Sequence, residues 1–177
     1  RIKRIIDHIR IFSRTQKPNA LERVDVNDVV TSALLMVGAQ FQTHNVVVEV
    51  ELAREKCIII GDKFKLEQVV LNLFSNAKHA VDEKEKQHID GYQKRILIKT
   101  WLTEHNVNFS VRDNGIGIHA DILEKIYDPF FTTKNEEKGT GLGLSIAYGF
   151  IKDILGEIRV DSDLGEFSVF EISIPQS

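Results

Sequence analysis

One segment near the middle of the chain, LEQVVLNLFSNAKHAV at positions 66–81, constrains the fold more than any other. Its apolar residues recur at helical spacing and form the stripe of a helix that packs on a core. These residues are Leu66, Val70, Leu73, Ala77 and Val81. The pattern predicts a long helix over about residues 63–81.

A second face of this helix is polar. Asn72, Asn76 and His79 are spaced i, i+4 and i+7, so their side chains follow one line. Asparagine is a poor helix former, and two of them in an otherwise apolar helix indicate a task other than folding. An amide oxygen can ligate Mg²⁺ while phosphates neutralise its charge, although these asparagines can also cap neighbouring backbone groups.

Strands and helices alternate along the rest of the chain. Strands are predicted at 46–52, 57–60, 95–103, 106–113, 157–162 and 166–175, and helices at 120–126 and 142–155. A further helix is predicted to follow an N-cap at Asn27 or Asp28 and to end at about residue 43. The continuous apolar run at 57–60 is typical of a strand buried on both faces. Residues 82–94 are charged and aperiodic, which indicates a solvated loop without chemistry. The order predicts an α/β two-layer sandwich, a mixed sheet with helices on one face.

The first twenty residues form a separate unit in this interpretation. Their apolar positions have helical spacing and end before Pro18, which predicts a short amphipathic helix. A helix of this length is marginal in water alone, so we expect it to pack on another helix, within a dimer or from an upstream segment. Because the chain begins at Arg1 inside this pattern, we expect a piece of a longer protein, with the main domain at 21–177.

Composition excludes several classes of protein. The chain has 23 Lys+Arg against 26 Asp+Glu and no basic stripe, so nucleic acid is not an expected partner. Its single cysteine, Cys57, excludes an internal disulfide and is expected to be a buried core thiol. Without an apolar run of about 20 residues, the piece is expected to be cytoplasmic, and the parent to reach a membrane only through a missing sensor region.

A glycine-bearing turn follows the predicted strand 106–113. In the sequence Asp113-Asn114-Gly115-Ile116-Gly117-Ile118, two glycines at alternate positions allow close approach to a flat ligand. A carboxylate at a strand end can accept a hydrogen bond from an exocyclic amine such as that of adenine. Taken alone, Asp-Asn-Gly is also an ordinary turn.

Two further segments lie before the helix at 142–155. The run DPFFTTK at 128–134 places two exposed-looking aromatics, Phe130 and Phe131, beside hydroxyls and a lysine, as in the hinge and anchor of a lid. The run GTGLGLS at 139–145 leads straight into a helix, and such a turn presents unpaired N–H groups to phosphate. It lacks the Gly-Lys-Ser/Thr of a Walker A loop.

The four segments in this order resemble the N, G1, F and G2 boxes of the sensor histidine kinases, within the superfamily of gyrase, the Hsp90 chaperones and MutL. The resemblance implies a Bergerat-type ATP-binding fold that binds ATP and Mg²⁺ beneath a lid. It implies Asn76 as the Mg²⁺ ligand, and Asn72, His79 and Lys134 in catalysis. The residues it places at the nucleotide are Asn72, Asn76, His79, Asp113, Gly115, Gly117, Ile118, Phe131, Thr132, Thr133, Lys138, Gly139, Thr140, Gly141, Leu142, Gly143 and Leu144.

Residues 1–20 are similar to the end of the family's dimerisation hairpin, which implies a homodimer in the parent and a phosphoacceptor histidine upstream of Arg1. The family's acceptor is followed by an acidic residue, whereas His8 is followed by Ile9 and Arg10, so we do not expect His8 to be phosphorylated. The resemblance also implies a response regulator receiver domain as partner.

Asn72 separates kinase from hydrolase within the superfamily. Hydrolytic members resemble one another in having a glutamate at this position as general base, and Glu67 is off the Asn72–Asn76 line. Three alternatives remain: an ATP-driven machine of the chaperone or gyrase kind, a serine kinase like the anti-sigma factors, and a nucleotide-binding scaffold without chemistry. The sequence favours an autokinase that transfers the ATP γ-phosphoryl group to histidine.

Overall fold

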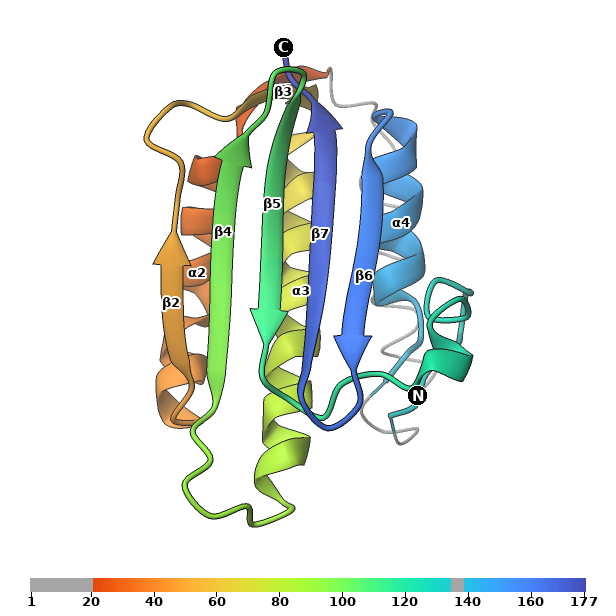
Figure 1. The fold of residues 1–177 in the computed structure, drawn as a ribbon. Coiled ribbons are helices and arrows are strands. Elements are labelled where there is room, and N and C mark those ends of the chain that lie inside the picture. Colours follow the sequence, from red (N-terminus) through yellow and green to blue (C-terminus); the bar gives the residue numbers. More distant parts are fainter. Residues whose placement is uncertain (1–20, 135–138) are drawn as a thin grey trace.

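The computed structural model describes residues 21–134 and 139–177. Its main sheet has the order β2-β4-β5-β7-β6, with β2 parallel to β4 and the other neighbours antiparallel. The strands are β2 (Val47–Glu51), β4 (Arg95–Leu102), β5 (Asn106–Asp113), β6 (Glu157–Asp163) and β7 (Phe167–Pro175). The helices α2 (Val26–Thr43), α3 (Lys63–Glu85) and α4 (Gly143–Asp153) lie on one face of this sheet (Figure 1). The predicted α/β two-layer sandwich is confirmed.

The core lies between α3 and the central strands. Leu66, Val70 and Leu73 of the predicted stripe are at most 1% exposed, and they face the inward residues of the sheet, such as Phe109 and Ile172, which are fully buried. Alternate residues of each strand point to this side, because the side-chain period of a strand is two. Each such large side chain stabilises the fold by about 1.5 to 3 kcal/mol through burial.

A second, two-stranded sheet corrects one prediction. Among the described residues, β3 (Ile58–Gly61) pairs only with β1 (Glu22–Asp25), antiparallel and outside the main sheet. Ile60 is therefore 43% exposed, and the prediction of a strand buried on both faces is wrong. Cys57, just before β3, is fully buried, as expected.

The helix starts differ from the predicted ones. α2 begins two or three residues earlier than expected because Asp25, rather than Asn27 or Asp28, is its N-cap and accepts a hydrogen bond from the backbone N of Asn27 at 3.1 Å. Asp62 caps α3 in the same way. The predicted helix 120–126 is wrong, since only a 3-10 turn, η1 (Ala120–Ile122), forms there. Its i to i+3 backbone bonds tighten the chain into successive turns.

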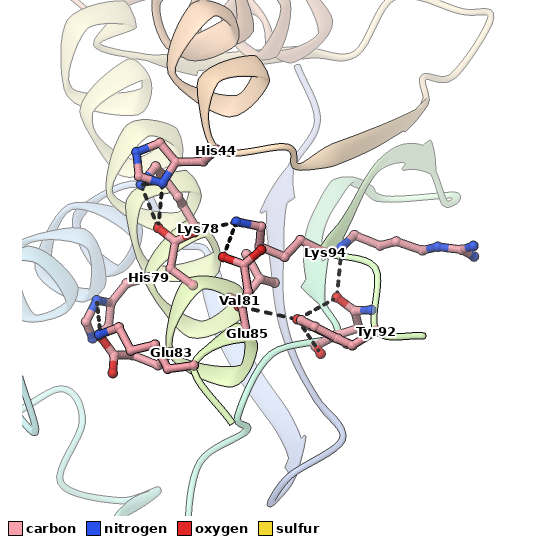
Figure 2. Close-up of polar contacts among 12 residues, drawn as sticks. His44, Lys78, His79, Val81, Glu83, Glu85, Tyr92 and Lys94 are labelled. Carbon is pink, nitrogen blue, oxygen red and sulfur yellow. Dashed lines mark hydrogen bonds and ion pairs between the residues drawn. The ribbon is translucent and has the colours of Figure 1, made fainter. Parts of the chain in front are cut away.

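The charged stretch 82–94 is a solvated loop only in part: residues 85–91 and 93 are exposed, but the two ends of the stretch are not. α3 continues to Glu85, and the ammonium of Lys94, 4% exposed, contacts Asp82 at 3.2 Å and Glu85 at 2.7 Å (Figure 2). Asp82 also forms an ion pair with the ammonium of Lys78 at 2.7 Å. These ion pairs hold the last turns of α3 against the start of β4.

None of the helices in the described part of the chain is long and apolar enough to cross a membrane.

Candidate nucleotide site

The polar line of α3 contacts two loops that are distant in sequence. The side-chain amide of Asn72 donates from Nδ2 to the carbonyl oxygen of Gly143 at 3.1 Å, at the start of α4. One turn later, Oδ1 of Asn76 accepts a hydrogen bond from Nζ of Lys134 at 2.8 Å. Three of the predicted site segments therefore meet at one stretch of α3.

Asp113 ends β5 in a buried position. The residue is 3% exposed, and its Oδ1 accepts a hydrogen bond from the backbone N of Gly115 at 2.8 Å. Burial raises the pKa of this carboxyl to about 7, against the opposing effects of backbone hydrogen bonds from Gly115 and Ser168 and of the charges on Lys84 and Arg112. Near neutral pH this carboxyl group is therefore present in two forms, a protonated form that can donate a hydrogen bond and an ionised form that only accepts them.

The two glycines after Asp113 have no room for a side chain. A Cβ on Gly115 would lie 2.4 Å from the carbonyl carbon of Ala80 in α3. Gly117 has a φ of +67°, and a Cβ there would lie 2.1 Å from the carbonyl oxygen of Asp163. The backbone N of Ile118 donates to the hydroxyl of Ser162 at 2.8 Å. The turn is thus fixed between α3 and the β6–β7 hairpin, at the end of the sheet where α4 begins (Figure 1).

The F and G2 segments are paired with each other. The backbone N of Phe130 donates to the carbonyl oxygen of Gly141 at 2.9 Å, and a Cβ on Gly141, whose φ is +68°, would lie 2.4 Å from the carbonyl carbon of Phe130. A Cβ on Gly139 would lie 2.4 Å from Oγ1 of Thr132. The position before α4, Leu142, makes no side-chain cap, which leaves the first N–H groups of that helix without a side-chain partner at the cap.

The aromatic pair of the F segment differs from expectation. Phe130 is 66% exposed, but Phe131 is half-buried and packs against the core, so only one of the two is exposed. The neighbouring Tyr127 also packs there.

The remaining predicted site residues have varied surroundings. His79 lies on α3 with Nδ1 3.9 Å from Oε1 of Glu83, one turn onward (Figure 2). Thr133 is exposed, Leu144 packs against the core and Oγ1 of Thr140 accepts from the backbone N of Leu142 at 3.4 Å. Lys138 lies outside the described residues. Burial lowers the pKa of Lys134.

Sequence reasoning missed several residues that build this site. Ser162 and Ser168 on the β6–β7 hairpin hold the backbone of Ile118 and the carboxyl of Asp113, and no local pattern marks either serine. Lys84 is buried at 8% exposure near Asp113, inside a stretch whose charge suggested solvent. The sequence signal for Lys84 is its spacing, because it lies eight residues after Asn76, two intervals of four along the same helix.

Known proteins resemble this chain over most of its length. Residues 61–177 match the family described as histidine kinase-, DNA gyrase B-, and HSP90-like ATPase. Sensor kinase CckA of Brucella abortus is 36% identical over 97% of this chain and 19% of its own length. The signal transduction histidine-protein kinase AtoS of Escherichia coli is 35% identical over 98% of this chain and 27% of its own length. The chain thus spans about a fifth to a quarter of these relatives.

Solved structures have the same fold. The nucleotide-free catalytic domain of histidine kinase ThkA superposes with a TM-score of 0.75 at 29% identity, covering 88% of this chain and 97% of that one. ThkA in complex with the response regulator protein TrrA superposes with a TM-score of 0.74 at 24% identity, covering 99% of this chain and 48% of that one. The chain belongs to the histidine kinase-, DNA gyrase B- and HSP90-like ATPase family, as an ATP-binding catalytic domain of the sensor histidine kinase type.

Proposed function

We propose that this domain binds ATP together with Mg²⁺ and passes the γ-phosphoryl group to a histidine imidazole, for relay to an aspartate of a response regulator. The observation that carries the proposal is the way α3 joins the four segments. Asn72 contacts Gly143, Asn76 contacts Lys134, and the carbonyl oxygen of Ala80 accepts from the backbone N of Ile116 at 3.2 Å. A base-binding end and a phosphate-binding end thus share one helix.

Asp113 would identify the base. When ionised, its carboxylate accepts hydrogen bonds, and the exocyclic amine of adenine donates one. A charge-assisted bond of this kind contributes about 1.5 to 3 kcal/mol. Guanine has a carbonyl oxygen in place of that amine, so it would set an acceptor against the carboxylate and lose this hydrogen bond. Gly115 and Gly117 would form the floor, because the chain there lies directly against Ala80 and Asp163.

Asn76 would hold the metal. Its Oδ1 already accepts a cation, the ammonium of Lys134 at 2.8 Å, which indicates that a positive group fits at this oxygen. Among the described residues no three His, Cys, Asp or Glu side chains gather into a metal site, so the donors beside Asn76 would be phosphate oxygens. A bound Mg²⁺ would neutralise phosphate charge as the γ-phosphoryl group is transferred.

Lys134 and the start of α4 would bind the phosphates. A cation on Asn76 competes with Lys134 for the same oxygen, so Lys134 is available to a phosphate once the amide is otherwise engaged. The N–H groups at the start of α4 add a positive dipole end to the same site. Thr132 and Thr140 of the paired loops remain predicted contributors, as does Lys138, which lies outside the described residues.

Transfer would occur by in-line attack. A neutral imidazole nitrogen forms a bond to the γ-phosphorus as the bond to the β–γ bridging oxygen breaks, ADP leaves with that electron pair, and one imidazole proton passes to solvent. Asn72 favours this outcome over hydrolysis, because its amide is a weak base and its Nδ2 is bound to Gly143. His79 stays a candidate for phosphate contact.

The partners follow from the same proposal. A dimerisation hairpin, of which residues 1–20 would be the last part, would supply the acceptor histidine in a homodimer, and a receiver domain would accept the phosphoryl group from it. The complex of ThkA with TrrA, which shares this fold, supports the second step. Residues 1–20 lie outside the described part of the chain.

Labelling with γ-³²P-ATP tests the proposal. The full-length parent protein should acquire an acid-labile, alkali-stable phosphate, whereas the 177-residue chain should bind ATP without labelling itself. An Asn72→Ala variant of the parent should label more slowly without gaining hydrolysis. Steady release of inorganic phosphate by the wild-type chain, with no labelling of the parent, would contradict phosphotransfer in favour of an ATP-driven machine.

A further inference from the structure

α3 carries a row of residues that continues past the polar line. Asn72, Asn76, Ala80 and Lys84 follow one another at intervals of four, a spacing that forms a ridge slanting round a helix. The first three contact Gly143, Lys134 and Ile116 respectively. Lys84 lies about 12 Å along the axis from Asn76, at the base end of the site.

The ammonium of Lys84 is buried with few partners. The residue is 8% exposed, and its Nζ lies 3.5 Å from the carbonyl oxygen of Glu166 and 5.2 Å from the centre of the Tyr92 ring. An ammonium has three donors, and a buried charge is costly unless an opposite charge compensates it. One long hydrogen bond and one ring leave most of that compensation to a neighbouring anion.

Asp113, buried beside Ser168 at the end of β5, is the anion whose surroundings adjoin those of this ammonium. Both neighbours of Lys84 adjoin it. Glu166 immediately precedes β7, where the backbone of Ser168 donates to the Asp113 carboxyl, and the hydroxyl of Tyr92 donates to the carbonyl oxygen of Asn114 at 3.1 Å (Figure 2). The charge of Lys84 acts on Asp113 to lower the carboxyl pKa, against its burial.

Other charged groups near Asp113 are differently placed. Arg112 also favours the ionised carboxyl, but its side chain is exposed and its guanidinium lies over Phe167, 4.2 Å from the ring centre. Tyr92 has a pKa raised by burial and by nearby carboxylates, including Asp113, so it stays neutral. The Asp82 and Glu85 carboxylates pair with Lys94.

We propose that Lys84 is a positioning residue of the base site, a buried cation on α3 that stabilises the Asp113 carboxylate as the acceptor of the adenine amine. The proposal rests on the assignment of Asp113 as the adenine acceptor. Lys84 itself does not touch the nucleotide. It joins the base end of the site to the same helix that carries the proposed metal ligand.

The test is the pH dependence of ATP affinity. Mg-ATP is titrated calorimetrically into wild type, Lys84→Met and Lys84→Arg between pH 6 and 9, after thermal unfolding has verified that each variant is folded. Removing an opposite charge raises a carboxyl pKa by about one unit or more. Lys84→Met should therefore bind about five-fold more weakly than wild type near pH 7 and within about two-fold at pH 9, and Lys84→Arg should restore the wild-type profile.

Two controls separate the possible failures. Arg112→Gln removes an exposed charge beside Asp113 and should leave the midpoint within about 0.3 pH units, because solvent screens it. Asp113→Asn should bind weakly at every pH. If Asp113→Asn binds like wild type, the adenine assignment fails. If it loses binding but Lys84→Met has the wild-type profile, or is weakened equally at all pH values, only the role of Lys84 is overturned. Lys84→Gln replaces Lys84→Met if the latter unfolds.

Discussion

Asp113→Asn should stabilise the nucleotide-free domain, and more so as the pH rises. Burial raises the pKa of the Asp113 carboxyl from an ordinary 3.8 to about 7. A shift of about three units corresponds to an ionisation cost on the order of 4 kcal/mol at pH above 7, since each unit is worth about 1.4 kcal/mol. Asparagine never ionises, so the variant avoids this cost.

The sign follows from proton binding. Between pH 4 and 7 the folded protein holds a proton on Asp113 that the unfolded chain has lost, so the free energy of unfolding of the wild type falls as pH rises through this window. The amide also makes different hydrogen bonds from the carboxyl, which changes the free energy of unfolding by about 1 to 3 kcal/mol. This change does not depend on pH. The growth of the difference between variant and wild type is therefore the quantity to measure.

Urea unfolding at pH 5, 6, 7 and 8 measures it. The stability of Asp113→Asn relative to wild type should rise by about 2 to 3 kcal/mol from pH 5 to pH 8. Asp161→Asn, on the exposed face of β6, is the matched control and should give a nearly constant difference. A constant difference for Asp113→Asn as well would refute the burial cost assigned to this carboxyl.

Three further variants test other parts of the site. Asn76→Ala should bind ATP equally with Mg²⁺ and with EDTA, whereas wild type should bind at least about ten-fold more tightly with the metal, as measured by calorimetry. Gly141→Ala should cost about 1 to 3 kcal/mol of stability and most of the ATP affinity, because of its positive φ and its close backbone contact, while Gly38→Ala, in open space on α2, should not destabilise the domain. Lys94→Met should cost about 1 to 3 kcal/mol in urea unfolding, since it removes the buried cation that pairs with Asp82 and Glu85, against at most about 0.5 kcal/mol for Lys99→Met, whose ion pair with Glu51 is exposed.

Periodicity predicted the parts of this fold that depend on neighbouring residues. The stripe of α3, the hairpin of β4 and β5 and the start of α4 all carry strong local patterns, and each forms close to its expected bounds. The polar line was also visible, because i, i+4 spacing fixes which side chains share a helical face. Its contacts with Gly143 and Lys134 could only come from the structure.

The errors arose where distant segments decide the outcome. The run 57–60 has the composition of a central strand, but in the described part of the chain it pairs with β1 alone, so Ile60 faces solvent. The charge of residues 82–94 and their lack of periodicity indicated a solvated loop, because neither property shows which charged side chains pair with each other in the fold. Lys94 is buried only because Asp82 and Glu85 come from the helix beside it. Tertiary ion pairs of this kind leave no local sequence pattern.

In the proposed nucleotide site along α3, the buried carboxylate of Asp113 at the end of β5 selects adenine by accepting a hydrogen bond from its exocyclic amine. Competition calorimetry at pH 8 tests this selection most directly, with Mg-ATP and Mg-GTP titrated into wild type and Asp113→Asn. Wild type should bind ATP at least about ten-fold more tightly than GTP, as expected for one lost charge-assisted hydrogen bond, and Asp113→Asn should lose this preference. Equal binding of the two nucleotides by wild type, or an unchanged preference in Asp113→Asn, would contradict this role of Asp113.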